Sequence, residues 1–123
     1  MGEIKMEYRE VRLDELEEIA ELHNQLAYTI QEETKDIYWD FEQLSREETY
    51  NYILNFAKHE HCKIYVACEG QNIRGFIMGE IVQCHLPVSG VKQVGYISGA
   101  YVLETYRHQG IMRLLESNMV SFF

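Results

Sequence analysis

The stretch from Tyr101 to Leu115, YVLETYRHQGIMRLL, contains the local pattern that decides the fold. It begins with apolar residues typical of a buried strand and ends with apolar residues at helical spacing. Between them lies a short polar turn, residues 107–110. The first backbone N–H groups of a helix have no partner within the helix and attract anions. This strand–turn–helix unit therefore predicts a phosphate-binding site.

Two residues of the turn favour a nucleotide-like ligand with a pyrophosphate. Gly110 has no side chain, so a phosphate can approach the backbone closely there. Arg107 can donate a charge-assisted hydrogen bond to the same phosphate.

Size and composition set the outer limits. The 123 residues, 46% hydrophobic and 25% charged, suit one globular domain spanning residues 1–123. The net charge of −9 argues against a nucleic-acid partner and is compatible with a cationic one such as an amine. No apolar run approaches the ~20 residues of a membrane span, and no signal peptide is visible. The three widely spaced cysteines indicate reduced thiols and a cytoplasmic protein.

The hydrophobic pattern predicts the element order β-α-α-β-β-β-α. Residues 4–11 are a strand, a helix starts at a capping box formed by Asp14 and Glu17 and runs to about residue 30, and 31–44 are a loop. Ser45 and Glu48 cap a second helix. A hairpin follows, with strands at 64–68 and 73–82, then a loop at 84–92, a strand at 94–103 and a helix from 111. Gly75 and Gly79 within the hairpin indicate a bulge or close approach by another backbone.

Residues 107–112, Arg-His-Gln-Gly-Ile-Met, resemble motif A of the Gcn5-related N-acetyltransferases: Arg or Gln, two residues, Gly, one residue, then Gly or Ala. Residues 101–106 resemble that family's fourth strand, and the hairpin its second and third. The resemblance implies an α+β, acyltransferase-like fold with a mixed central sheet and flanking helices, its C-terminal strands missing after Phe123. Two residues depart from the pattern: Met112 replaces a small residue, and Glu104 replaces a proline.

The resemblance also implies acetyl-coenzyme A as co-substrate, without a metal. In the family the amine attacks the thioester directly, and a strand N–H polarises the thioester carbonyl. Carried over, the backbone that faces the pantetheine arm belongs to Ala100, Tyr101, Val102 and Leu103. The residues that wrap the pyrophosphate are Arg107, His108, Gln109, Gly110, Ile111 and Met112.

The acceptor amine must lose a proton, so a base is expected, and the candidates are Glu80, Tyr96 and Ser98. The family's usual general acid, a tyrosine, is expected beyond residue 123. Tyr28, Tyr38 and Trp39 either line the acceptor cleft or pack in the core. His23 is either a core residue or part of the acceptor-site wall.

Two functions remain open from the sequence. One is an N-acetyltransferase acting on a primary amine of a small molecule or protein, and the other is a degenerate, non-catalytic module that binds coenzyme A or a protein. An exposed edge at the fourth strand predicts a homodimer or exchanged assembly. His59, His61 and Cys62 are interpreted as a solvated connection, because adjacent ligands rarely close a tetrahedral metal site. Cys84 and His85 are not interpreted as a nucleophile and its base, because neighbours on a strand point to opposite faces.

Overall fold

The order of helices and strands follows the sequence pattern. The computed structural model describes residues 5–34, 45–83, 90 and 93–123. Its elements are β1 (Met6–Glu10), the 3-10 helix η1 (Leu13–Glu15), α1 (Leu16–Thr34), α2 (Arg46–Lys58), β2 (Cys62–Glu69), β3 (Asn72–Gln83), β4 (Gln93–Val102), the 3-10 helix η3 (Glu104–Tyr106) and α3 (Ile111–Phe122). The predicted order β-α-α-β-β-β-α is confirmed. None of the described helices has the length and apolar composition of a membrane span.

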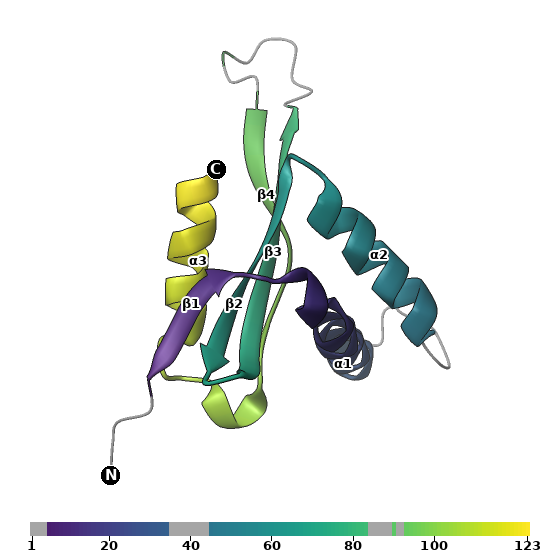
Figure 1. Ribbon diagram of the computed structural model, residues 1–123, viewed down its shortest axis with the longest axis vertical. Coiled ribbons are helices and arrows are strands. Elements are labelled where there is room, and N and C mark those ends of the chain that lie inside the picture. Colours follow the sequence, from purple (N-terminus) through teal and green to yellow (C-terminus); the bar gives the residue numbers. More distant parts are fainter. Residues whose placement is uncertain (1–4, 35–44, 84–89, 91–92) are drawn as a thin grey trace.

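The four described strands form one sheet in the order β1-β2-β3-β4, and every pairing among them is antiparallel. Figure 1 shows α1 and α2 on one face of this sheet and α3 on the other. The expected α+β fold with flanking helices is confirmed, although the mixed strand directions are not seen among these strands. β1 and β4 are the two edges, so one backbone edge of β4 has no neighbouring strand in the described part of the chain.

Each face of the sheet carries its own core. On the α1 and α2 face, the fully buried side chains include Leu16, Ile19, Ile53, Ile64, Phe76 and Met78. On the α3 face they include Ala67, Ile77, Leu115 and Met119. Alternate residues of β3 therefore enter opposite cores, as the two-residue period of a strand requires. The sheet fixes the start of α3 relative to α1, which positions the site described below.

The ends of the two N-terminal helices were only partly predicted. Ser45 Oγ accepts a hydrogen bond from the Glu48 N–H (3.2 Å), which confirms the cap of α2. The predicted Asp14–Glu17 box at α1 is wrong, because Glu15 Oε1 instead accepts from the Arg12 N–H (2.9 Å) and η1 precedes the helix. α1 also continues to Thr34, since residues 31–33, Gln-Glu-Glu, are good helix formers.

The two glycines of β3 allow close approach in different ways. A Cβ on Gly75 would lie 3.1 Å from the Tyr101 carbonyl oxygen, which confirms the expected approach by another backbone. A Cβ on Gly79 would instead collide with the Met119 side chain of α3. The register also shifts here, from Met78 opposite Gly99 to Gly79 opposite Ile97. This shift at Gly79 confirms the bulge that the sequence analysis gave as an alternative, and it leaves Ser98 as the extra residue in β4.

One ion pair ties β1 to the start of α1. Both guanidinium Nη atoms of Arg9 donate to the Glu15 carboxylate, at 2.8 and 2.7 Å, and both side chains are largely buried. The hydrogen bond from Arg9 lowers the pKa of Glu15, against the opposing effect of burial. A depressed folded-state pKa stabilises the fold above the unfolded pKa of about 4.3, and this contribution is lost as the pH falls through the folded value.

Glu15→Gln is therefore expected to lower the free energy of unfolding at neutral pH by about 2 kcal/mol. The variant should also lose less stability than the parent as the pH falls below about 5. Urea unfolding across this pH range measures both effects, with Glu17→Gln, an exposed residue of the first turn of α1, as control. Parallel pH profiles of parent and Glu15→Gln would contradict the assignment.

Candidate functional site

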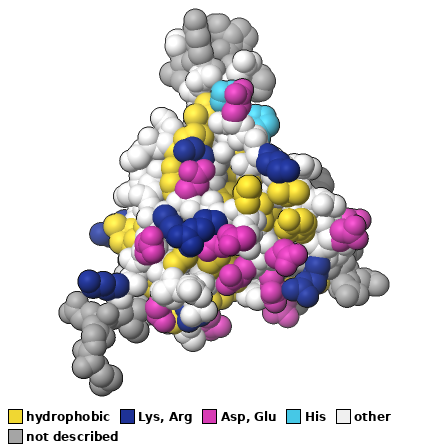
Figure 2. Space-filling view, in the orientation of Figure 1, with side chains coloured by type: hydrophobic (Ala, Val, Ile, Leu, Met, Phe, Trp, Pro, Cys, Tyr) yellow, Lys and Arg dark blue, Asp and Glu magenta, His cyan; other side chains and the backbone are white. Residues whose placement is uncertain are grey.

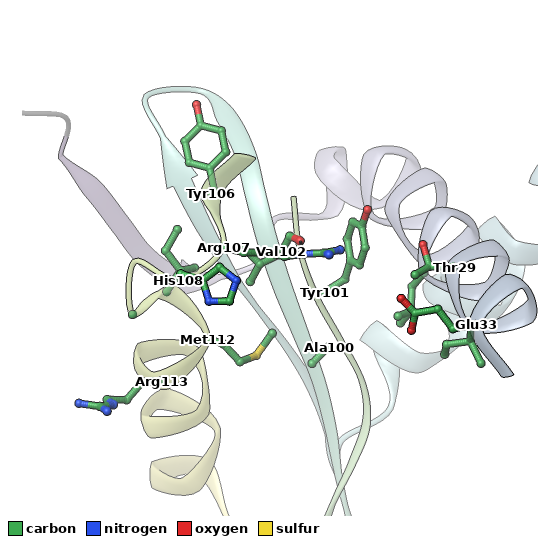
Figure 3. Close-up of a pocket in the computed structure, with 14 residues that line it drawn as sticks. Thr29, Glu33, Ala100, Tyr101, Val102, Tyr106, Arg107, His108, Met112 and Arg113 are labelled. Atoms are coloured by element: carbon green, nitrogen blue, oxygen red, sulfur yellow. Dashed lines mark hydrogen bonds between the residues drawn. The ribbon is translucent and has the colours of Figure 1, made fainter. Parts of the chain in front are cut away.

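A pocket of about 510 Å³ lies between α1, the end of β4 and the start of α3 (Figure 3). The α1 wall consists of Leu26, Thr29, Ile30 and Glu33. The opposite wall consists of Ala100, Tyr101, Val102, Tyr106, Arg107, His108, Gly110, Ile111, Met112 and Arg113. Most of the strand–turn–helix unit that predicted a phosphate-binding site therefore borders one hollow.

The turn before α3 has left-handed backbone conformations at two residues. His108 has φ 66° and Gly110, the N-cap of α3, has φ 81°. A Cβ built on Gly110 would meet no protein atom within 4 Å, so the space beside this glycine is open. The first intrahelical bond runs from the Leu114 N–H to the Gly110 carbonyl (3.3 Å). The N–H groups of the first turn thus remain available at the pocket to an anion.

Arg107 is anchored to the end of β4. Its Nε donates to the Val102 carbonyl (2.9 Å), and its guanidinium lies 5.5 Å from the centre of the Tyr101 ring. Figure 3 shows this stacking at the pocket wall. Arg107 forms no ion pair with any described residue. The side chain therefore shapes the turn and still carries a free positive charge at the pocket.

The three candidate bases lie farther along the sheet, Glu80 on β3 and Tyr96 and Ser98 on β4. Glu80 and Tyr96 are direct cross-strand partners and share one face. Cys62 Sγ donates to Glu80 Oε2 at 3.9 Å, and burial followed by the Glu80 charge raises the pKa of the Cys62 thiol. Ser98 sits on the bulge, and its buried hydroxyl has no hydrogen-bond partner among the described residues. None of the three lines the 510 Å³ pocket.

A family model, the acetyltransferase (GNAT) family, matches residues 14–122. This chain belongs to the GNAT acetyltransferase family. The family uses acetyl-coenzyme A as acyl donor, and the matched residues include the turn that borders the pocket. No curated protein matches the chain in sequence.

Solved structures support the same GNAT fold. A tetramutant of the BH1408 protein from Bacillus halodurans is 25% identical with a TM-score of 0.79, over 94% of this chain and 74% of that one. The aminoglycoside acetyltransferase AAC(6')-Iy, in complex with a bisubstrate analogue of coenzyme A, is 16% identical with a TM-score of 0.74, over 96% and 71%. A predicted acetyltransferase from Clostridium acetobutylicum with acetyl-CoA is 15% identical with a TM-score of 0.76, over 95% and 72%.

Eight of the ten residues expected at a GNAT cofactor site line the pocket, and two do not. The Leu103 N–H donates to the Arg74 carbonyl (2.9 Å) and the Leu103 carbonyl accepts from the Tyr106 N–H (2.8 Å). Both backbone groups of Leu103 thus already have partners within the chain, and its expected place at the pantetheine arm stays a prediction. Gln109 lies outside the lining of this pocket and borders a second hollow with Met6 and Glu69, and its expected place at the pyrophosphate stays a prediction.

Met112, the departure from the GNAT motif, does not close the pocket. Its half-buried side chain packs against the α3-face core. In Figure 3 it points toward Ala100 on β4 rather than across the turn. The unusual residue therefore forms part of the pocket floor.

The sequence missed the α1 wall and two residues of the turn. Leu26, Thr29 and Ile30 lie within the predicted helix, whereas Glu33 reaches the pocket because α1 continues to Thr34. Tyr106 and Arg113 flank the turn itself. The absence of glycine or proline after Ile30 was the signal for the longer helix.

The structure describes only some of the residues expected on the acceptor side. Tyr28 lies on α1 outside the pocket lining, and Tyr38 and Trp39 lie outside the described residues. The His23 ring is half-buried, 5.7 Å from the Tyr52 ring and 6.4 Å from the Phe76 ring. Burial lowers the pKa of His23, so its imidazole is neutral at physiological pH.

His59 and His61 lie exposed in the connection from α2 to β2, as interpreted from the sequence, whereas Cys62 is buried and begins β2. The His61 N–H donates to His59 Nδ1 (3.1 Å). No group of three metal-binding side chains occurs within residues 5–34, 45–83, 90 and 93–123.

Proposed function

We propose that this chain transfers the acetyl group of acetyl-coenzyme A to a primary amine of a small molecule or protein. The observation that carries the proposal is the Arg107–Met112 turn, which opens onto the 510 Å³ pocket with Gly110 in a left-handed conformation. Family membership supplies the acyl donor.

The residues present fit a pyrophosphate at the turn. The N–H groups at the start of α3 and the Arg107 guanidinium supply the donors and the charge that phosphates require. The open space beside Gly110 leaves the backbone accessible. Figure 2 shows basic and acidic side chains interspersed on one face of the molecule, without a continuous basic surface there. The pyrophosphate would be held by these backbone donors and the Arg107 guanidinium, with Arg113 as a second cation in the pocket lining.

The outer edge of β4 fits the pantetheine arm. β4 is an edge strand in the described sheet, so alternate backbone groups of Ala100 to Val102 face away from β3. Such groups bind an extended amide chain by strand-like hydrogen bonds. A backbone N–H on this edge can polarise the thioester carbonyl as its oxygen gains negative charge.

We assign Glu80 as the group that accepts the proton of the acceptor amine, through water. The amine nitrogen then forms a bond to the acetyl carbon, and the bond from that carbon to sulfur breaks. The nitrogen loses its second proton to solvent as the amide forms, and the coenzyme A thiolate leaves and takes a proton from solvent. Tyr96 lies across the strands from Glu80 and orients the water, and the Ser98 hydroxyl lies between Tyr96 and the pantetheine edge along β4.

Calorimetry with acetyl-coenzyme A should show binding, and a broad panel of amines should include at least one that releases free thiol. No binding up to millimolar acetyl-coenzyme A would reject the proposed function. Binding without amine-dependent thiol release would instead favour the degenerate coenzyme A-binding module.

The predicted homodimer or exchanged assembly stays a proposal. Val94 and Ile97 are exposed near the β4 edge, where strand pairing with a second copy would cover them. Sedimentation at several protein concentrations measures the oligomeric state.

A further inference from the structure

A group of five side chains meets on the α1 and α2 side of the sheet, away from the pocket. These residues, which we call the Glu80 cluster, are His23, Tyr52, Cys62, Glu80 and Tyr96. Glu80 is paired across the strands with Cys62 on one side and Tyr96 on the other. Burial has the largest effect in raising the pKa of Tyr52 on α2, and Tyr52 lies close enough for the charges of Glu80, Cys62 and Tyr96 to raise it further. His23 packs against Tyr52 from α1.

The cluster contains one uncompensated negative charge. Glu80 is half-buried, yet no lysine or arginine forms an ion pair with it in the described part of the chain. Other half-buried carboxylates do have such partners: Glu15 of η1 pairs with Arg9, and Glu69 of β2 pairs with Arg74. Within the cluster, burial keeps His23 and Cys62 neutral. A half-buried carboxylate without a cation is costly unless a ligand supplies one.

Two solvent-exposed tyrosine side chains belong to the same cluster as this carboxylate. Tyr52 is 48% exposed and Tyr96 is 58% exposed, although both stand next to a packed core. An ammonium group near the faces of such rings is attracted by their quadrupoles. A carboxylate flanked by two open tyrosine rings has the composition of a site for an organic cation.

We propose that the Glu80 cluster selects the acceptor, and that this acceptor is an alkylammonium compound with no carboxylate near its amine. This inference rests on the proposed function, and it names the substrate class. The ammonium group binds against Glu80 between Tyr52 and Tyr96, and the overall charge of −9 favours its approach. A carboxylate near the same amine would face Glu80 and be repelled.

Diaminobutane and aminobutyrate have the same chain length, but only aminobutyrate has a carboxylate. The two compounds therefore represent the amines that the cluster should bind and those it should repel. We expect diaminobutane to shift the ring proton signals of Tyr52 and Tyr96 in NMR titrations at low ionic strength, and to bind at least about tenfold more tightly than aminobutyrate. Glu80→Gln should weaken diaminobutane by about tenfold or more, because a charge-assisted contact is lost. Glu116→Gln, which removes an exposed charge from α3 on the opposite face, should change nothing.

A second pair of variants tests the contribution of the Tyr96 ring while leaving the Glu80 charge unchanged. Tyr96→Phe should keep the affinity for diaminobutane, since the ring face remains, and Tyr96→Leu should weaken it severalfold. Because Tyr96 is exposed, both variants are expected to fold even if Glu80→Gln does not, and thermal melts check this. Equal affinities for the two ligands, or equal behaviour of Tyr96→Phe and Tyr96→Leu, would overturn the inference.

Titration of acetyl-coenzyme A into the same samples distinguishes a failure of the acceptor inference from a failure of the proposed function. If acetyl-coenzyme A binds and the amines do not discriminate, only the acceptor inference fails. If acetyl-coenzyme A does not bind, the proposed function fails, whatever the cluster does.

Discussion

Gly110→Val is expected to lower the affinity for acetyl-coenzyme A about a hundredfold. Gly110 has φ 81°, a conformation in which a β-branched residue is a strong outlier. Valine would force the turn to change shape, and its side chain would occupy the open space beside the start of α3. Both effects remove backbone donors from the pyrophosphate. Calorimetry of the parent and the variant measures the loss.

Gly70→Val is the matched control for this substitution. Gly70 also has a positive φ, 64°, and a Cβ added there would also meet no protein atom within 4 Å. It lies in the turn between β2 and β3, outside the pocket lining. The two variants should lose similar stability, of about 1–3 kcal/mol, but only Gly110→Val should lose affinity. Equal affinities of the two variants would show that the turn does not bind the pyrophosphate.

The strand–turn–helix unit could be predicted because its signals are local. Apolar runs mark β4 and α3, and Gly110 marks the turn between them. The Ser45 cap and the hairpin turn near Gly70 are local in the same way. Each of these features depends on residues within about one turn of one another, so the sequence pattern contains the whole cause.

The corrected features depend instead on contacts between distant segments. The Ser98 bulge exists only relative to the register of β3, which sequence periodicity does not specify. The Leu103 N–H donates to the Arg74 carbonyl, which lies far earlier in the chain, and no local pattern at Leu103 indicates this contact. The open rings and unpaired charge of the Glu80 cluster likewise depend on how α2 and two strands meet.

Met119→Ala is expected to lower the free energy of unfolding by about 2–5 kcal/mol. Met119 is fully buried and lies in the core between α3 and the sheet. Gly79 on β3 has no side chain, and a Cβ there would collide with Met119. The methionine therefore fills space that the glycine leaves, and removing it creates a cavity against β3. Val120→Ala, at the next and exposed position, should change stability by less than about 0.5 kcal/mol.

Gly79→Ala tests the same contact from the other side. Alone it should destabilise by about 1–3 kcal/mol, because the new methyl overpacks a site where Met119 has no free space to move. In the double variant this methyl enters the space vacated by Met119. The double loss should then be smaller than the sum of the single losses by at least about 0.5 kcal/mol. Urea unfolding of the four proteins measures this coupling. Simple additivity would mean that α3 does not pack on β3 through these two residues, and the placement of the pocket turn would lose its structural basis.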